Sequence, residues 1–128
     1  MKIVVLAGGL SPERDVSLSS GSLIANALLE NGHKVLLLDL YKGMDYDGNI
    51  EKLYIGDKTK KYEYKVPQRE PDMERLIFET GNGKSLIGKN VIEICKSADM
   101  VFIALHGSIG ENGQLQAVFD CFGIPYTG

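Results

Sequence analysis

Three continuous apolar runs constrain what this chain can fold into. They span Lys2–Ala7, which ends at a pair of glycines, then 35–40, and finally 100–105. A run of this length without polar alternation is typical of a strand buried on both faces of a parallel sheet. Between the first two runs, apolar residues recur at helical spacing over 16–28. Strand, loop, helix and strand within about forty residues predict a right-handed crossover unit and an α/β fold.

The remaining pattern predicts further helices and one inserted segment. The first helix has two candidate starts, Ser11 followed by Pro12, or Asp15 as the cap,. Helical spacing also predicts helices over 87–97 and 113–122. The short apolar groups 76–78 and 85–87 flank a Gly-Asn-Gly turn and predict a hairpin in the inserted segment,. Residues 41–75 are polar, with mixed charges and scattered tyrosines, as expected of a solvated surface.

Length and charge exclude several functional classes. The 128 residues suit one domain, and the formal net charge is −3,. This balance argues against nucleic acid or an anionic membrane as the main partner, because both require a clustered basic face. No apolar run reaches the roughly 20 residues needed to span a bilayer, and no signal peptide is evident. Cys95 and Cys121 lie in apolar stretches and are expected to be buried free thiols of a cytoplasmic protein,.

Two loops that follow predicted strands carry the side chains suited to chemistry. The loop after the first strand contains Glu13, and the loop after the third contains His106 and Glu111. If those strands are neighbours, the three side chains converge beyond the carboxyl edge of the sheet, where α/β proteins bind ligands. Carboxylates that an imidazole orients would suit an ammonium group. The alternative is structural: Glu13 would favour a helix N-terminus, and His106 would bond to backbone.

Neither glycine-rich stretch fits a nucleotide site. Gly83–Ser85 resembles the end of a phosphate-binding loop, but Phe78 stands where that pattern requires glycine,. After the first strand, Ser11 and Arg14 break the glycine spacing of a dinucleotide fingerprint,. We therefore expect no ATP or NAD site formed by residues of this chain.

The two loops together resemble known motifs. The stretch LAGGLSPERDVSL at 6–18 resembles the opening motif of D-alanine–D-alanine ligases. FIALHG at 102–107, GENG at 110–113 and Gln116 are similar to the second motif of that family. IPYTG at 124–128 is similar to the segment that closes its N-terminal domain. The family usually has Asp where this chain has Asn112; the charge is lost, but the turn should survive.

The resemblance implies a fold and a reaction. Residues 1–128 would form the N-terminal substrate-binding domain, a Rossmann-like three-layer sandwich with a mostly parallel sheet that precedes the ATP-grasp domains. Family members join two D-alanines for peptidoglycan synthesis in the cytoplasm, using ATP and Mg²⁺. Both are held by the ATP-grasp domains, which this chain lacks, so it should be inactive alone. The partners implied are D-alanine, those domains and a second copy in a homodimer, with neither nucleic acid nor membrane.

The resemblance also assigns roles to individual residues. Glu13 would hold the ammonium of the first D-alanine, and Val16 would line that site. Ser17 belongs to the same motif. His106 would orient Glu13 or the substrate, and Glu111 would support the site from the second loop. Two alternatives remain open from the sequence: a relative that adds D-lactate or D-serine second, and a free-standing amino-acid-binding domain without chemistry.

Overall fold

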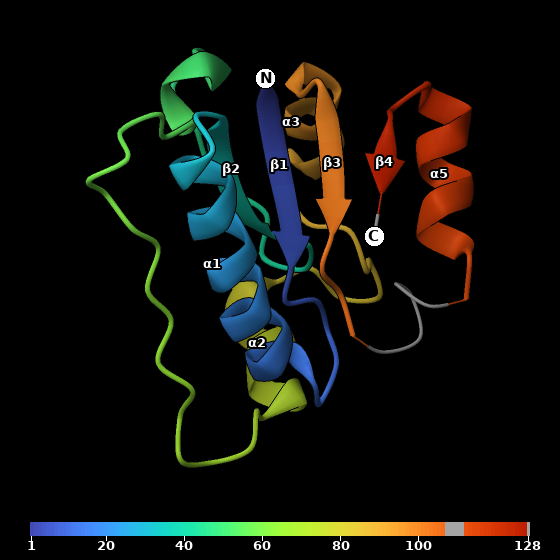
Figure 1. Cartoon of the computed structure of the whole chain (residues 1–128). Coiled ribbons are helices and arrows are strands. Elements are labelled where there is room, and N and C mark those ends of the chain that lie inside the picture. The colour runs from blue at the N-terminus through green and yellow to red at the C-terminus, as the bar shows by residue number, and fades with distance from the viewer. Residues whose placement is uncertain (107–111, 128) are drawn as a thin grey trace.

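A four-stranded, all-parallel sheet forms the centre of the molecule (Figure 1). The computed structural model describes residues 1–106 and 112–127. Its strands, in the spatial order β2-β1-β3-β4, are β1 (Lys2–Ala7), β2 (Lys34–Asp39), β3 (Met100–Ile103) and β4 (Tyr126–Thr127). Leu6 of β1 is in register with Leu38 of β2 on one side and Ile103 of β3 on the other. The three predicted strands and the parallel α/β fold are thereby confirmed.

Helices cover both faces of this sheet and give three layers. Alternate residues of β1 point to opposite faces, so Val5 packs in one apolar cluster with α1 (Arg14–Glu30), while Leu6 packs in another,. That second cluster includes residues of α3 (Val91–Ser97) and α5 (Gln114–Phe122). Figure 1 shows α1 on the near side of the sheet and α3 on the far side. None of the helices in the described ranges has the length and apolar character needed to cross a membrane.

The helix α1 begins at Arg14, between the two predicted starts. Its N-cap is Glu13, whose side chain makes no capping bond. Ser11 instead belongs to a turn before the helix, since the Arg14 N–H donates to the Ser11 carbonyl at 3.0 Å. The Asp15 carboxylate accepts a hydrogen bond from a distant tyrosine and is therefore not the cap. Both predicted caps are wrong by two residues because each side chain has another partner.

The predicted hairpin around residues 76–87 is wrong. The structure has the helix α2 (Met73–Thr80) there, followed by irregular chain. Asp72 caps this helix by accepting from the Arg75 N–H at 3.1 Å, and Gly81 ends it in the left-handed conformation, with φ 67°,. The glycine taken for a hairpin turn is thus a helix stop.

One cysteine also differs from the prediction. Cys95 is buried in α3, as expected, but Cys121 is exposed in the last turn of α5. The apolar residues of α5 that face the core are Leu115 and Phe119, four residues apart on one side of the helix,. Cys121 lies on the opposite side, so its apolar neighbours in the sequence did not indicate burial.

The polar middle of the chain is attached to α1 at defined points. We call residues 57–72 the strap; in Figure 1 it runs alongside α1 from the 3₁₀ helix η1 (Ile50–Leu53) to α2. The backbone of Tyr62 pairs with the side chain of Asn26 on α1 through bonds of 2.7 and 2.9 Å. The Tyr62 hydroxyl donates to the Val35 carbonyl of β2 at 3.0 Å. The strap is therefore solvated but anchored, and its tyrosines are the anchors.

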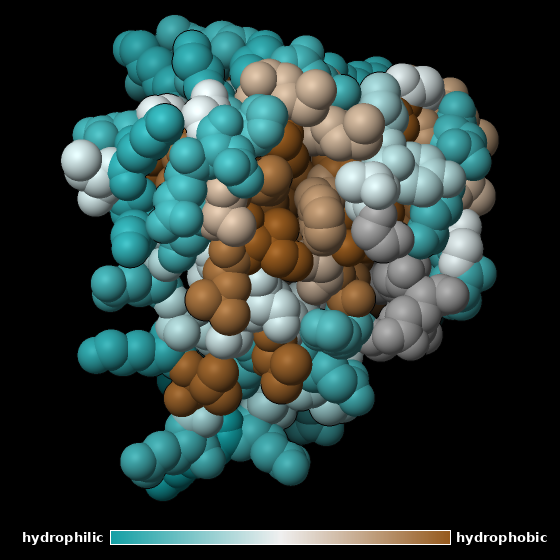
Figure 2. All heavy atoms as spheres, viewed as in Figure 1, coloured by the Kyte–Doolittle hydropathy of each residue, from teal (hydrophilic) through white to brown (hydrophobic). Residues whose placement is uncertain are grey.

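The near side of the sheet is only partly covered. Figure 2 shows hydrophobic residues gathered at the surface over the middle of the molecule in this view. On that side Met100 and Phe102 of β3 are half-buried and pack against the α1 cluster. An apolar surface of this kind commonly contacts other protein.

Candidate functional site

The two loops predicted to carry the site leave adjacent strands at the same edge. β1 and β3 pair in parallel, so the chain after Ala7 and the chain after Ile103 emerge side by side. The Ala104 N–H donates to the Leu6 carbonyl at 2.8 Å and extends this pairing beyond β3. The condition on which convergence depended, that the first and third strands are neighbours, is met.

Ser17 joins these two loops directly. Its hydroxyl donates to the Ala104 carbonyl at 2.7 Å and accepts from the Gly8 N–H at 2.9 Å. The side chain is fully buried. One hydroxyl therefore satisfies a donor from the β1 loop and an acceptor from the β3 loop, and within 1–106 and 112–127 neither of these buried groups has another partner,.

Glu13 and Val16 lie on the solvent side of the same loop and helix start. Glu13 is exposed, and one of its carboxylate oxygens accepts from the Ser11 hydroxyl at 2.5 Å. Its backbone carbonyl accepts the first helical bond, from the Ser17 N–H. Val16 follows three residues later and is 55% exposed. A spacing of three places Glu13 and Val16 on one face of the helix start, with a carboxylate and an apolar side chain open to a ligand.

The second loop is described only in part. His106 lies just beyond β3 and is half-buried, three residues after the end of the strand. Glu111 lies outside the described residues. Asn112 stands two residues before the start of α5, where its side-chain oxygen accepts from the Gln114 N–H at 3.1 Å. Asparagine thus maintains a local turn at this position without the charge of aspartate.

A buried ion pair that the sequence analysis did not predict holds the glycine turn after β1. The Arg14 guanidinium donates to Asp39 at the end of β2 at 2.5 Å and to the Gly9 carbonyl at 2.6 Å. The other Asp39 oxygen accepts from backbone N–H groups, among them Gly9 at 3.3 Å and Tyr41 at 3.0 Å. Gly8 has φ 77°, and a Cβ there would lie 2.8 Å from the Asp39 carboxyl carbon. The Gly8 backbone therefore approaches Asp39 closely.

On the other side of the helix start, Asp15 binds the strap. The Tyr64 hydroxyl donates to the Asp15 carboxylate in a short hydrogen bond, and Asp15 is only 8% exposed. Burial, together with this bond to a carboxylate, raises the pKa of Tyr64 to about 12,. The hydroxyl thus keeps its proton, and its role as donor, through neutral pH.

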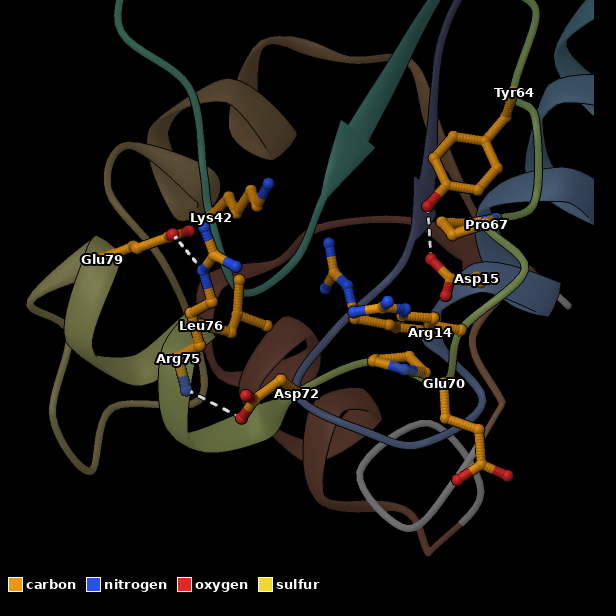
Figure 3. A pocket seen from close by; sticks show the side chains of 12 residues that line it. Arg14, Asp15, Lys42, Tyr64, Pro67, Glu70, Asp72, Arg75, Leu76 and Glu79 are labelled. Atoms are coloured by element: carbon orange, nitrogen blue, oxygen red, sulfur yellow. Dashed lines mark hydrogen bonds and ion pairs between the residues drawn. The ribbon is translucent and has the colours of Figure 1, made fainter.

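A cleft of about 500 Å³ opens beside this contact (Figure 3). Arg14 and Asp15 of α1 and Tyr64 of the strap line one side of the cleft. Lys42 and Leu76 line the side that faces Tyr64. Figure 3 shows the Tyr64 ring reaching from the strap toward Asp15, while Glu70 points away from the cleft. Of the predicted site residues that the structure describes, none lines this cleft. It therefore lies behind the helix start and is distinct from the face that carries Glu13.

The described residues form no cluster of metal ligands, and their lysine-containing glycine stretch does not follow a strand. Across 1–106 and 112–127, no three His, Cys, Asp or Glu side chains are grouped to hold a metal ion. Gly83–Ser85 follows the helix α2, whereas a phosphate-binding loop follows a strand,. The side chains at the two loops are a carboxylate, an imidazole and an apolar group. This combination suits a small ligand with an ammonium group.

Comparisons with known proteins agree with the motifs. Residues 2–128 match the family described as D-ala D-ala ligase N-terminus. The chain is 44% identical over 131 residues to a D-alanine–D-alanine ligase of Lacticaseibacillus casei, and 46% identical over 132 residues to one of Pediococcus pentosaceus. These alignments cover all of this chain but 36% and 37% of the relatives. The chain thus spans little more than a third of the length of these curated relatives.

A solved structure supports the fold. The D-alanine–D-alanine ligase from Bacillus anthracis, complexed with ATP, matches with a TM-score of 0.52 at 22% sequence identity. The match covers 99% of this chain and 29% of that chain. The family resemblance expected from the two loop motifs is confirmed by these comparisons, and the solved structure extends the agreement to the fold.

Proposed function

The chain belongs to the family of D-alanine–D-alanine ligase N-terminal domains, and we propose that it helps to bind the first D-alanine in a complete ligase. That ligase joins two D-alanines for peptidoglycan synthesis in the cytoplasm. ATP, which supplies the phosphoryl group for activating the first carboxylate, and Mg²⁺ are held by ATP-grasp domains outside these residues. The share of the relatives that this chain covers supports such a division of labour.

The observation that carries this proposal is the open face formed by Glu13 and Val16 beside the His106 loop. The Glu13 carboxylate accepts hydrogen bonds from the ammonium of D-alanine, and Val16 contacts its methyl group. His106 orients the carboxylate or the substrate from the neighbouring loop, and Glu111 supports it from farther along that loop. Ser17, whose hydroxyl is already bonded at both ends, contributes by holding the loops together.

In this proposal the chain positions substrate and transfers no proton. Fixing the ammonium of the first D-alanine sets the direction of its carboxylate, where bond formation takes place. An exposed carboxylate on a fixed helix start suits this role because it exchanges water for a charged donor on binding. The partly uncovered apolar side of the sheet supports a contact with the following domains or with a second copy in a homodimer,.

The test is the variant Glu13→Gln in the complete ligase. It retains the shape of the side chain and removes the charge that pairs with the ammonium. A charge-assisted hydrogen bond contributes about 1.5–3 kcal/mol, so kcat/KM for D-alanine should fall by roughly 10- to 150-fold. Glu30→Gln, which changes an exposed glutamate at the far end of α1, should leave it unchanged. Equal kinetics for the two variants would remove Glu13 from the site.

A further inference from the structure

The strap reaches the start of α1 at one hydroxyl group, that of Tyr64. We propose that Tyr64 is a positioning residue for the D-alanine site, acting through Asp15 to fix the helix start that carries Glu13. This inference rests on the proposed function and adds to its site a residue of the strap. Tyr64 and Asp15 are 49 residues apart in the sequence, and only the course of the strap along α1 brings them together.

Asp15 depends on this contact. Its carboxylate is buried in the first turn of α1, where an ionised group without partners is costly,. Within the described ranges, the Tyr64 hydroxyl is the hydrogen-bond donor to that carboxylate. Without the hydroxyl, Asp15 either stays buried and unpartnered or turns toward water, and turning requires the first turn of the helix to move.

Glu13 lies where such a movement is felt. It is the N-cap residue, two positions before Asp15, and its own side chain makes no capping bond that would hold the first turn. The first turn is instead held on one side by the ion pair of Arg14 with Asp39, and on the other by Asp15 with Tyr64. The backbone turn that carries Glu13 is therefore held by partners from distant segments, while the Glu13 carboxylate itself bonds only the neighbouring Ser11 hydroxyl among the described residues. A shift of about 1 Å in a positioning group is enough to cost two orders of magnitude in rate.

The strap supplies its own control. Tyr62 lies two residues before Tyr64, and its hydroxyl donates to the Val35 carbonyl of β2 at 3.0 Å. Both tyrosines anchor the strap with one hydroxyl each, but only Tyr64 touches the helix start. Removing either hydroxyl loosens the strap; removing that of Tyr64 also releases Asp15.

The experiment compares Tyr64→Phe with Tyr62→Phe in the complete ligase. At saturating ATP, we expect Tyr64→Phe to raise the KM for the first D-alanine about tenfold, the loss of one hydrogen bond to a charged group. The KM for ATP should not change. Tyr62→Phe should keep the KM for D-alanine of the unaltered ligase while still lowering its Tm, because it also removes one anchoring hydroxyl of the strap. Equal KM values for D-alanine in the two variants would overturn the proposal and leave Tyr64 as a structural anchor.

A second comparison tests the route through Asp15. Asp15→Asn removes the charge that needs the Tyr64 hydroxyl, so Tyr64→Phe should have little further effect on the KM in that background. An undiminished tenfold effect would show that Tyr64 acts by another route and would overturn the proposal. The Glu13→Gln variant separates the two proposals. If it leaves the KM unchanged, the proposed function fails; if it raises the KM and Tyr64→Phe does not, this inference alone fails.

Discussion

Replacing Ser17 with alanine should remove the connection between the two loops of the site. The Ser17 hydroxyl satisfies the Gly8 N–H and the Ala104 carbonyl at 2.9 and 2.7 Å, and the side chain is fully buried. Each buried backbone group left without a partner costs about 1–3 kcal/mol. The gain in helix propensity from serine to alanine returns about 0.5 kcal/mol. The free energy of unfolding should therefore fall by about 2–5 kcal/mol, a large part of the ordinary stability of a domain.

The assay is urea unfolding of the 128-residue chain, followed by circular dichroism at neutral pH. With a slope of about 2 kcal/mol per molar urea, a loss of about 3 kcal/mol lowers the midpoint by roughly 1.5 M. Hydrogen exchange adds a local measurement, because the Gly8 amide should be protected in the original chain and should exchange rapidly in Ser17→Ala,.

Ser22→Ala is the matched control. Ser22 is also buried in α1, but its hydroxyl donates to the Leu18 carbonyl at 2.9 Å, which already accepts a helical N–H,. Deleting that hydroxyl leaves no backbone group without a partner, so the free energy of unfolding should change by less than about 0.5 kcal/mol. If Ser17→Ala and Ser22→Ala have the same midpoint, the bridge between the loops contributes nothing and the reasoning is refuted.

Two further predictions concern packing and thiol reactivity. Gly21→Ala should lower the free energy of unfolding by about 1–3 kcal/mol, although alanine has the better helix propensity. The reason is that its Cβ would lie 2.9 Å from the Ala7 Cβ, where α1 packs on β1. A variant that is more stable in urea would contradict this packing. Burial raises the pKa of the Cys95 thiol to about 12, so at pH 8 it carries almost no thiolate,. A thiol reagent should therefore label the exposed Cys121 alone in the native chain and both cysteines in urea; native labelling of Cys95 would contradict its burial.

The sheet could be predicted from the sequence because its strands are buried on both faces. Continuous apolar runs have few alternative explanations when glycine or a charge ends them, and β1 and β2 match their predictions to within one residue. The helix α2 could not be told from a hairpin by periodicity, since Leu76 is its one buried residue and Phe78 is 88% exposed. The signal that was available lay in the cap residues, Asp72 at the start and Gly81 at the end.

The partners of Arg14 and Asp15 could not be predicted for a different reason. Both charges were visible in the loop, but Asp39 lies 25 residues away from Arg14, and Tyr64 lies 49 residues away from Asp15. These pairs form because β2 is adjacent to β1 and because the strap follows α1. Residue types alone do not contain that information. The same limit applies to Ser17, whose acceptor at Ala104 is 87 residues away.

The helical period explains why one short motif serves both structure and ligand. Glu13 and Val16, three residues apart, are exposed, whereas Arg14 and Ser17, also three apart, are buried,. The polar groups of the inward pair form hydrogen bonds within the protein and do not face a substrate, so variants there should act on stability. The outward pair makes only an exposed contact, from Glu13 to Ser11, so variants there should act on kcat/KM with little change in stability. Tyr64 is informative because it lies between these classes: its hydroxyl binds the buried side of the turn whose exposed side carries Glu13.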